Sequence, residues 1–255
     1  MTDITKPFQY TFFGKVHPER CNVSIPEVRA EVRLGMDQVD GVLRYYISLS
    51  QVTATFITDN PVGNIYTLKN VVEDAVRVAL DALGYTLACG YDLEIIQVID
   101  STENPPVVFG VGIPAIERSA SDAGVTFQTI LSIFGDPKGQ YLQRCLSNLR
   151  EAIRVPKDTG FFCYRGIESL RDFFVQEKGA KDKNASWELL RTELSAVRAD
   201  LDLIKGFADP IRHGGGATIS DQERANVFTL TWGIVNSFIK YANAGYKSAV
   251  SPANP

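Results

Sequence analysis

The sequence predicts an α+β protein, with an N-terminal β-sheet domain covered by one helix and a C-terminal helical bundle. Runs of aromatic and β-branched residues are confined to the first half of the chain, whereas the second half repeats its apolar residues every three or four positions. The 255 residues exceed one domain of typical size, and 45% hydrophobic with 22% charged residues is typical of a globular protein. We therefore expect domains at 1–135 and 136–245, followed by a flexible, Pro-rich tail at 246–255.

Five segments of the first half have strand composition, and one segment has helical periodicity. Apolar residues fall on one helical face from Leu68 to Leu83, and Gly84 follows where a left-handed cap residue is expected. This helix is expected to cover the sheet that the strands form. The strand segments are 8–13, 42–49, 52–58, 93–99 and 107–113.

The second half predicts a series of helices. A short apolar helix is expected over 127–134, and apolar stripes indicate helices over 142–153 and 164–174. One long helix is expected from Trp187 to Ile211, ending at the triple glycine 214–216. The last helix begins at a capping box formed by Ser220 and Glu223, in which each side chain satisfies a backbone donor of the first turn.

The sequence excludes several classes of protein and site. No apolar run reaches the roughly 18 residues of a membrane span, and the N-terminus has no leader pattern, so we expect a cytoplasmic protein without membrane contact. Four cysteines at long spacings and two histidines predict no metal site. Cys89 and Cys163 stand in apolar segments and are expected to be buried thiols. The glycine motifs for phosphates and dinucleotides are absent or incomplete, which predicts no cofactor.

The charge is distributed unevenly between the two halves. Residues 1–135 carry 9 basic and 16 acidic side chains, a net charge of -7, and residues 136–255 carry 17 and 14, a net charge of +3. Arg150, Arg154 and Lys157 form a basic ridge at helical spacing, which could follow a phosphate backbone. The alternative is an ordinary solvated face. An anionic partner should therefore prefer the second half of the chain.

Three segments of the second half resemble the HEPN superfamily of small helical bundles, which includes prokaryotic toxins and antiphage ribonucleases. These are 164–168 (Tyr-Arg-Gly-Ile-Glu), the long helix led by Trp187, and 208–214 (Ala-Asp-Pro-Ile-Arg-His-Gly). The resemblance covers about residues 140–245. It implies an RNA-directed protein of stress response or phage defence that forms a homodimer through the bundle. An enzyme of this class would be a metal-independent endoribonuclease.

Ribonucleases of this superfamily carry an arginine, then a polar residue, and a histidine after four to six intervening positions. His213 fits the histidine and Asp209 fits the polar residue, but the possible arginine positions hold Ala208, Phe207 and Gly206. Because the arginine would make charge-assisted contacts to the scissile phosphate, its absence favours an inactive or atypical member. Neighbouring Arg212 could replace it only from the same cleft.

The candidate site residues each have two interpretations. Arg212 and His213 could contact RNA, with His213 transferring a proton, or they could simply stabilise the negative end of a helix dipole. Glu168 could orient Arg212 beside His213, or form a structural ion pair. Arg165, on the same segment as Glu168, is a further candidate for nucleic-acid binding. The protein is thus either an RNA-directed HEPN-like protein or a noncatalytic accessory protein that binds a partner.

Overall fold

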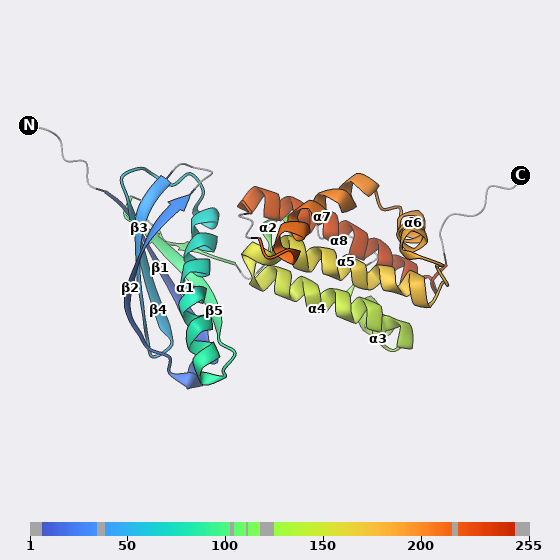
Figure 1. Ribbon diagram of the computed structural model, residues 1–255, viewed down its shortest axis with the longest axis horizontal. Coiled ribbons are helices and arrows are strands. Elements are labelled where there is room, and N and C mark those ends of the chain that lie inside the picture. Colours follow the sequence, from blue (N-terminus) through green and yellow to red (C-terminus); the bar gives the residue numbers. More distant parts are fainter. Residues whose placement is uncertain are drawn as a thin grey trace, which may run out of the picture. The chain divides into compact units, whose positions relative to one another are not determined.

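The computed structural model describes residues 7–34, 39–102, 105–110, 112–117, 125–215 and 219–247. The chain forms two compact units, residues 1–111 and residues 112–255. The expected boundary at 135/136 lies further along the chain than this division. Figure 1 shows a β-sheet with a long helix in the first unit and a set of helices in the second, so the protein has the predicted α+β architecture.

The N-terminal unit is a six-stranded antiparallel sheet whose strands are ordered β2-β3-β4-β1-β5-β6. Helix α1 covers one face, and its apolar side chains share a core with the strands (Figure 1). Alternating side chains of β1 and β4 face this core, as the period of a strand requires. The elements are β1 (Phe8–His17), β2 (Ile25–Leu34), β3 (Val39–Ser48), β4 (Gln51–Thr58), α1 (Ile65–Leu87), β5 (Asp92–Asp100) and β6 (Val107–Val108).

Three strand and helix predictions for this unit were wrong in detail, one of them the strand expected over 107–113, of which β6 forms only Val107–Val108. Strand β2 was not expected, although Val28, Ala30 and Val32 alternate with charged residues along this edge strand. Helix α1 continues past Gly84 to Leu87, and its C-terminal cap is Ala88, whose φ of 52° is left-handed. Gly84 is instead buried inside the helix, where a Cβ atom would lie 2.5 Å from the backbone oxygen of Cys89. The close approach of the Cys89 backbone, and not a helix cap, therefore explains why a glycine stands at this position.

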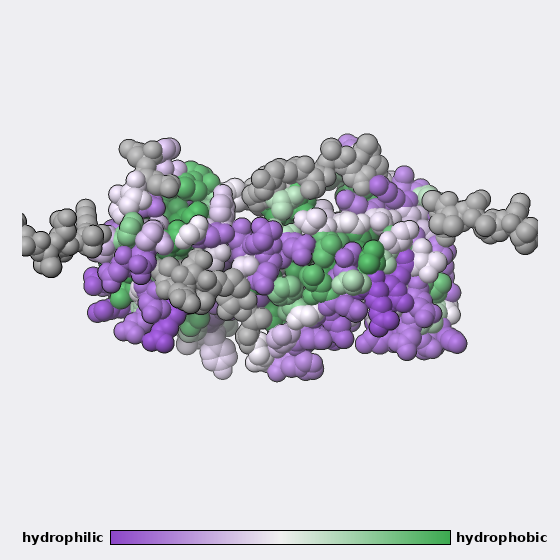
Figure 2. Space-filling view, turned by 90° about the horizontal axis from the view of Figure 1, so that it is seen from above, coloured by the Kyte–Doolittle hydropathy of each residue, from purple (hydrophilic) through white to green (hydrophobic). Residues whose placement is uncertain are grey.

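The C-terminal unit is built around the buried helix α5, which packs against α4, α6, α7 and α8. The short helix over 127–134 and the capping box of Ser220 and Glu223 are confirmed. Figure 2 shows hydrophobic and hydrophilic residues side by side on one face of this unit. The helices are α2 (Pro114–Glu117), α3 (Phe127–Phe134), α4 (Gln140–Arg154), α5 (Thr159–Gln176), α6 (Lys183–Leu194), α7 (Arg198–Arg212) and α8 (Asp221–Asn243).

The expected single helix from Trp187 to Ile211 is instead two helices, α6 and α7. Ser195 has a left-handed backbone, with φ of 52°, and the N–H of Ala196 donates a hydrogen bond to the carbonyl of Arg191. This arrangement closes α6 and redirects the chain. Because both helices bury their apolar face, the apolar periodicity continues across the break and does not reveal it in the sequence.

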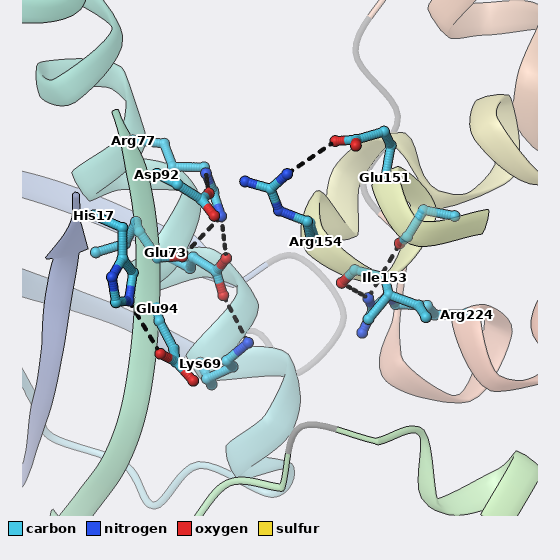
Figure 3. A network of polar contacts seen from close by, with 12 residues as sticks. His17, Lys69, Glu73, Arg77, Asp92, Glu94, Glu151, Ile153, Arg154 and Arg224 are labelled. Atoms are coloured by element: carbon cyan, nitrogen blue, oxygen red, sulfur yellow. Dashed lines mark hydrogen bonds and ion pairs between the residues drawn. The ribbon is translucent and has the colours of Figure 1, made fainter. Parts of the chain in front are cut away.

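Figure 3 shows a polar network within the N-terminal unit. The carboxylate of Glu73 is nearly inaccessible to solvent. It forms ion pairs with Lys69 at 2.6 Å and with Arg77 at 2.8 Å. Arg77 also binds Asp92 of β5 at 3.0 Å and donates to the carbonyl of Leu93. The buried charge is thus paired from both sides, and the network fastens α1 to β5.

A second network in Figure 3 joins two helices of the C-terminal unit. Arg224 of α8 donates to the carbonyls of Ile153 (2.7 Å) and Ala152 (3.3 Å) at the end of α4. Its Nε donates to the hydroxyl of Thr159, which in turn donates to the carbonyl of Ala152. The guanidinium therefore satisfies carbonyls that a helix C-terminus leaves unpaired, and it complements the helix dipole.

Of the two thiols that were expected to be buried, one is exposed. Cys163 is buried as expected, but Cys89 is exposed after the end of α1, so its prediction was wrong. The apolar residues near Cys89 include Leu87, which is itself 55% exposed. Of the helices within the described residues, none has the length and apolar character that crossing a bilayer requires.

Candidate functional site

The candidate site lies at the C-terminal end of α7. Arg212 is the last residue of the helix and His213 is its cap, and Gly214 turns the chain away with a left-handed φ of 78°. Both side chains are exposed. Within the described part of the chain the imidazole of His213 has no hydrogen bond or ion pair. It is therefore accessible to a ligand.

The structure brings Glu168 of α5 to Arg212. Nη1 of Arg212 lies 3.8 Å from Oε1 of Glu168, and the same oxygen lies 4.0 Å from Nη1 of Arg171. The three side chains are exposed to different extents, 37% for Arg212, 21% for Glu168 and 16% for Arg171. The carboxylate thus lies near two arginines. Arg171 is held more closely by Asp172, at 2.7 Å, and Arg212 is the arginine that remains more open to solvent.

Two stacked aromatic rings connect the same two arginines. Tyr164 and Trp187 stack with their ring centroids 5.8 Å apart. The guanidinium of Arg212 lies over Tyr164 at 5.9 Å, and that of Arg171 lies over Trp187 at 5.3 Å. Burial, followed by the nearby carboxylate of Glu168, raises the pKa of Tyr164. The rings therefore act as a neutral, rigid support for the two cations.

A pocket of about 490 Å³ opens between α6 and α7, with Tyr164 of α5 also in its wall. Its size is within the range of small-molecule sites. Five of its lining residues are basic and two are acidic, so the lining is net positive by three charges. The lining residues are Tyr164, Lys183, Asn184, Trp187, Glu188, Arg191, Arg198, Leu201, Asp202, Lys205 and Arg212.

The basic residues of the pocket differ in their partners. Arg198 lies 3.5 Å from Asp202, and Lys205 lies 3.6 Å from Asp209, both as exposed pairs one helical turn apart. Such pairs are weak and are readily exchanged for another anion. Lys183 and Arg191, by contrast, have no acidic partner within ion-pair distance among the described residues. Of the five basic residues of the pocket, Lys183 and Arg191 are therefore uncompensated among the described residues, whereas Arg198, Lys205 and Arg212 each have a carboxylate within ion-pair distance.

Of the three positions where the family arginine could stand, two cannot hold an exposed arginine in this fold. Ala208 is fully buried in the helical core, and Phe207 packs so closely on α5 that a Cβ atom at Gly160 would lie 2.4 Å from its Cβ. Gly206 is exposed, and no atom lies within 4 Å of an added Cβ atom there. Two of the three positions thus belong to the core, and only Gly206 could carry an exposed arginine.

The basic ridge is partly neutralised by its own helix. Both Arg150 (3.0 Å) and Arg154 (3.6 Å) lie close to the carboxylate of Glu151, and the second of these pairs is visible in Figure 3. Lys157 is exposed in the short turn after α4, and Arg165 is exposed on α5 with its guanidinium over the ring of Phe161. None of these four residues lines the pocket between α6 and α7.

Sequence reasoning missed most of the pocket, although a signal was present. The five basic residues Lys183, Arg191, Arg198, Lys205 and Arg212 follow one another at intervals of eight, seven, seven and seven positions. Seven residues are close to two helical turns, so the last three lie on one face of α7. This charge periodicity was overlooked because the apolar periodicity of the same segment is stronger.

The described residues contain no group of three or more His, Cys, Asp or Glu side chains that could hold a metal ion. Comparison with known proteins assigns no activity to the site. Residues 10–109 match the family described as Domain of unknown function (DUF8168) N-terminal domain, and residues 127–243 match Domain of unknown function (DUF8168) C-terminal domain. No curated protein and no solved structure matches the chain.

Proposed function

We propose that this protein is a cytoplasmic, RNA-directed protein of the HEPN class, and that its C-terminal unit contacts RNA at the end of α7. The observation that carries the proposal is the position of Arg212, which lines a net positive pocket and immediately precedes the exposed His213. Arginine binds phosphate oxygens through paired N–H donors. The segments 164–168 and 208–214, which carry the family resemblance, both contribute to this site.

Each residue has a chemical role in this proposal. Arg212 contacts a phosphate, and Glu168 restrains the guanidinium beside it. His213 is the proton-transfer group, because its exposed imidazole can both accept and donate a proton. Successive helical residues point about 100° apart, so Arg212 and His213 converge on one phosphate most readily when two protomers supply them. Cleavage therefore requires the homodimer that the resemblance implies. The biological role that we propose for this cleavage is stress response or phage defence.

A second candidate function is a noncatalytic accessory protein that binds RNA or a partner without cleaving it. The observation that favours it is the burial of Ala208, which leaves the core no room for the family arginine. In this case the N-terminal unit is the element that recognises a partner. Separate assays of RNA binding and RNA cleavage therefore distinguish the two candidate functions.

The experiment incubates the purified protein with total RNA at neutral pH, beside a His213→Ala variant. Cleavage by the wild type that the variant lacks supports the atypical ribonuclease. RNA that survives equally with both proteins, while both proteins bind it in a gel-shift assay, supports the noncatalytic candidate. Failure of the wild type to bind or cleave any RNA contradicts the proposed RNA-directed function as a whole.

A further inference from the structure

The pocket between α6 and α7 has two features that together specify a class of ligand. It has five basic side chains against two carboxylates, and its wall includes the partly exposed ring of Trp187, which stacks on the buried ring of Tyr164. A positively charged groove with aromatic side chains is the combination by which proteins hold single-stranded nucleic acid. We infer that this pocket binds a segment of single-stranded RNA, with the phosphates along α7; the inference rests on the proposed RNA-directed function.

The length of the basic row favours a strand over a single nucleotide. Arg198, Lys205 and Arg212 are seven residues apart on one helix, so each step is about 10.5 Å and the row is about 21 Å long. All three side chains line the pocket. The phosphates of one nucleotide cannot reach from Arg198 to Arg212, whereas successive phosphates of a strand can.

The second wall of the pocket carries the cations that lack a partner. Lys183 and Arg191 of α6 face the row on α7 across the pocket, and among the described residues neither has an acidic partner. An RNA phosphate placed there gains an ion pair without breaking an existing one. On α7 the phosphate exchanges with the exposed carboxylates of Asp202 and Asp209, which costs little because such pairs are weak.

The recessed shape distinguishes single strands from duplexes. The pocket lies between two helices that join at the corner formed by Ser195, with Tyr164 in its wall. A flexible strand can enter such a recess and place its bases against side chains, whereas a duplex is a rigid cylinder whose bases are stacked inside. The site is therefore expected to prefer single-stranded RNA to duplex RNA.

One experiment compares RNA binding by the basic row on α7 with RNA binding by the basic ridge on α4. The double variant Arg198→Gln/Lys205→Gln removes two charges from the row, and Arg150→Gln/Arg154→Gln removes two charges from the ridge. The two variants have the same net charge, and all four side chains are exposed on helix surfaces. Binding is measured by fluorescence anisotropy with an end-labelled oligouridylate, over a series of salt concentrations.

We expect the row variant to weaken binding roughly tenfold or more, because a hydrogen bond to a charged group contributes about that factor. Its slope of log affinity against log salt should decrease by about 1.4, since each lost phosphate contact on a single strand accounts for about 0.7. The ridge variant should bind almost as the wild type does. A duplex of the same length should bind more weakly than the oligouridylate.

Three results would overturn the inference. A ridge variant that loses binding while the row variant keeps it places the RNA on α4 and leaves the RNA-directed function intact. Uridine monophosphate that displaces the oligouridylate at equal phosphate concentration identifies a mononucleotide site instead. A wild-type protein that binds no RNA at all overturns the proposed function together with this inference.

Discussion

The guanidinium of Arg212 lies 3.8 Å from the carboxylate of Glu168, and the two side chains come from different helices, α7 and α5. The same carboxylate lies 4.0 Å from Arg171, so one acidic group lies near two arginines that also contact a pair of stacked rings. This arrangement keeps a carboxylate near the cation that immediately precedes His213. The interpretation of Glu168 as an orienting residue rests on this geometry.

Substituting Glu168→Gln should separate an orienting role from a structural one. We expect the free energy of unfolding to fall by less than about 1 kcal/mol, because both ion pairs are long and Arg212 is more than a third exposed. Any RNA cleavage seen with the wild type should fall about tenfold, since the glutamine cannot hold the guanidinium by charge. Denaturant unfolding and an RNA cleavage assay measure the two effects.

The matched control for this variant is Glu177→Gln, at the C-terminal end of the same helix. Glu177 lies 3.9 Å from Lys138 and is similarly exposed, but unlike Glu168 it does not pair with a residue that lines the pocket between α6 and α7. Cleavage should be unchanged in this control. A loss of several kcal/mol on substitution of Glu168 would show that its ion pairs are mainly structural.

Introducing the arginine of the family motif should change the stability of the protein differently at Ala208 and at Gly206. Ala208→Arg should destabilise the protein by at least about 3 kcal/mol, because the position is fully buried and the new charge has no room or partner there. Gly206→Arg should be neutral or stabilising by up to about 1 kcal/mol, because the position is exposed within a helix. Thermal unfolding of both variants checks this, and equal stability of the two would contradict the packing of α7 described above.

Two of the four thiols should be protected in the folded protein. Burial raises the pKa of Cys163 to about 12, and burial also raises the pKa of Cys145, whereas Cys21 and Cys89 are exposed. A thiol-reactive disulfide should therefore titrate two groups in the native protein and all four after unfolding. Four groups that react at once without denaturant would contradict the burial of Cys145 and Cys163.

The same two thiols should make the protein less stable at alkaline pH. In the unfolded chain a thiol ionises near its ordinary pKa of about 8.5, whereas the buried thiol remains protonated. The unfolded state then binds fewer protons, and the free energy of unfolding falls by up to about 1.4 kcal/mol per pH unit for each thiol. This decrease should begin above about pH 8.5, and substituting Cys163→Ala should reduce it.

The sequence predicted the parts of the fold that depend on local signals. Helix α3, the capping box of α8 and the end of α7 before Gly214 were all found where turn chemistry and apolar periodicity placed them. The break at Ser195 was not predictable from periodicity, because α6 and α7 both bury the same apolar stripe. Serine has no strong preference for a left-handed backbone, so no residue marked the corner.

The candidate site was predicted in part. The pairing of Glu168 with Arg212 was expected from two segments of the sequence, and the structure brings the two together. The charge periodicity over 183–212 could have indicated the basic residues of the pocket, but the recess itself depends on the corner between α6 and α7 and on Tyr164 in its wall, which the sequence does not specify. The basic ridge on α4 was predicted as a surface feature, but its pairing with Glu151 depends on side-chain positions that spacing does not specify.

The proposed homodimer should depend on the exposed apolar face of α3. Phe127, Leu131 and Phe134 lie three or four positions apart and are 70%, 51% and 40% exposed. Burying them in a second copy is favourable, since each apolar side chain removed from water contributes about 1.5–3 kcal/mol. The double variant Phe127→Ser/Leu131→Gln should therefore be a monomer in size-exclusion chromatography with light scattering.

The control for the dimer is Tyr85→Ser, which removes an aromatic ring that is 89% exposed on α1 of the N-terminal unit. This variant should remain a dimer. A wild-type protein that is monomeric over a wide range of concentration would remove the composite cleft of Arg212 and His213. The noncatalytic function would then be favoured.

Photocrosslinking tests most directly whether RNA contacts the C-terminal unit at α7. The intact protein is irradiated with single-stranded RNA that carries a photoreactive uridine, and the crosslinked peptides are mapped by mass spectrometry. Crosslinks should lie in peptides from 164–168 and 183–213, which include Tyr164, Trp187 and His213. Crosslinks confined to the sheet of the N-terminal unit, or to α4, would contradict the proposed site.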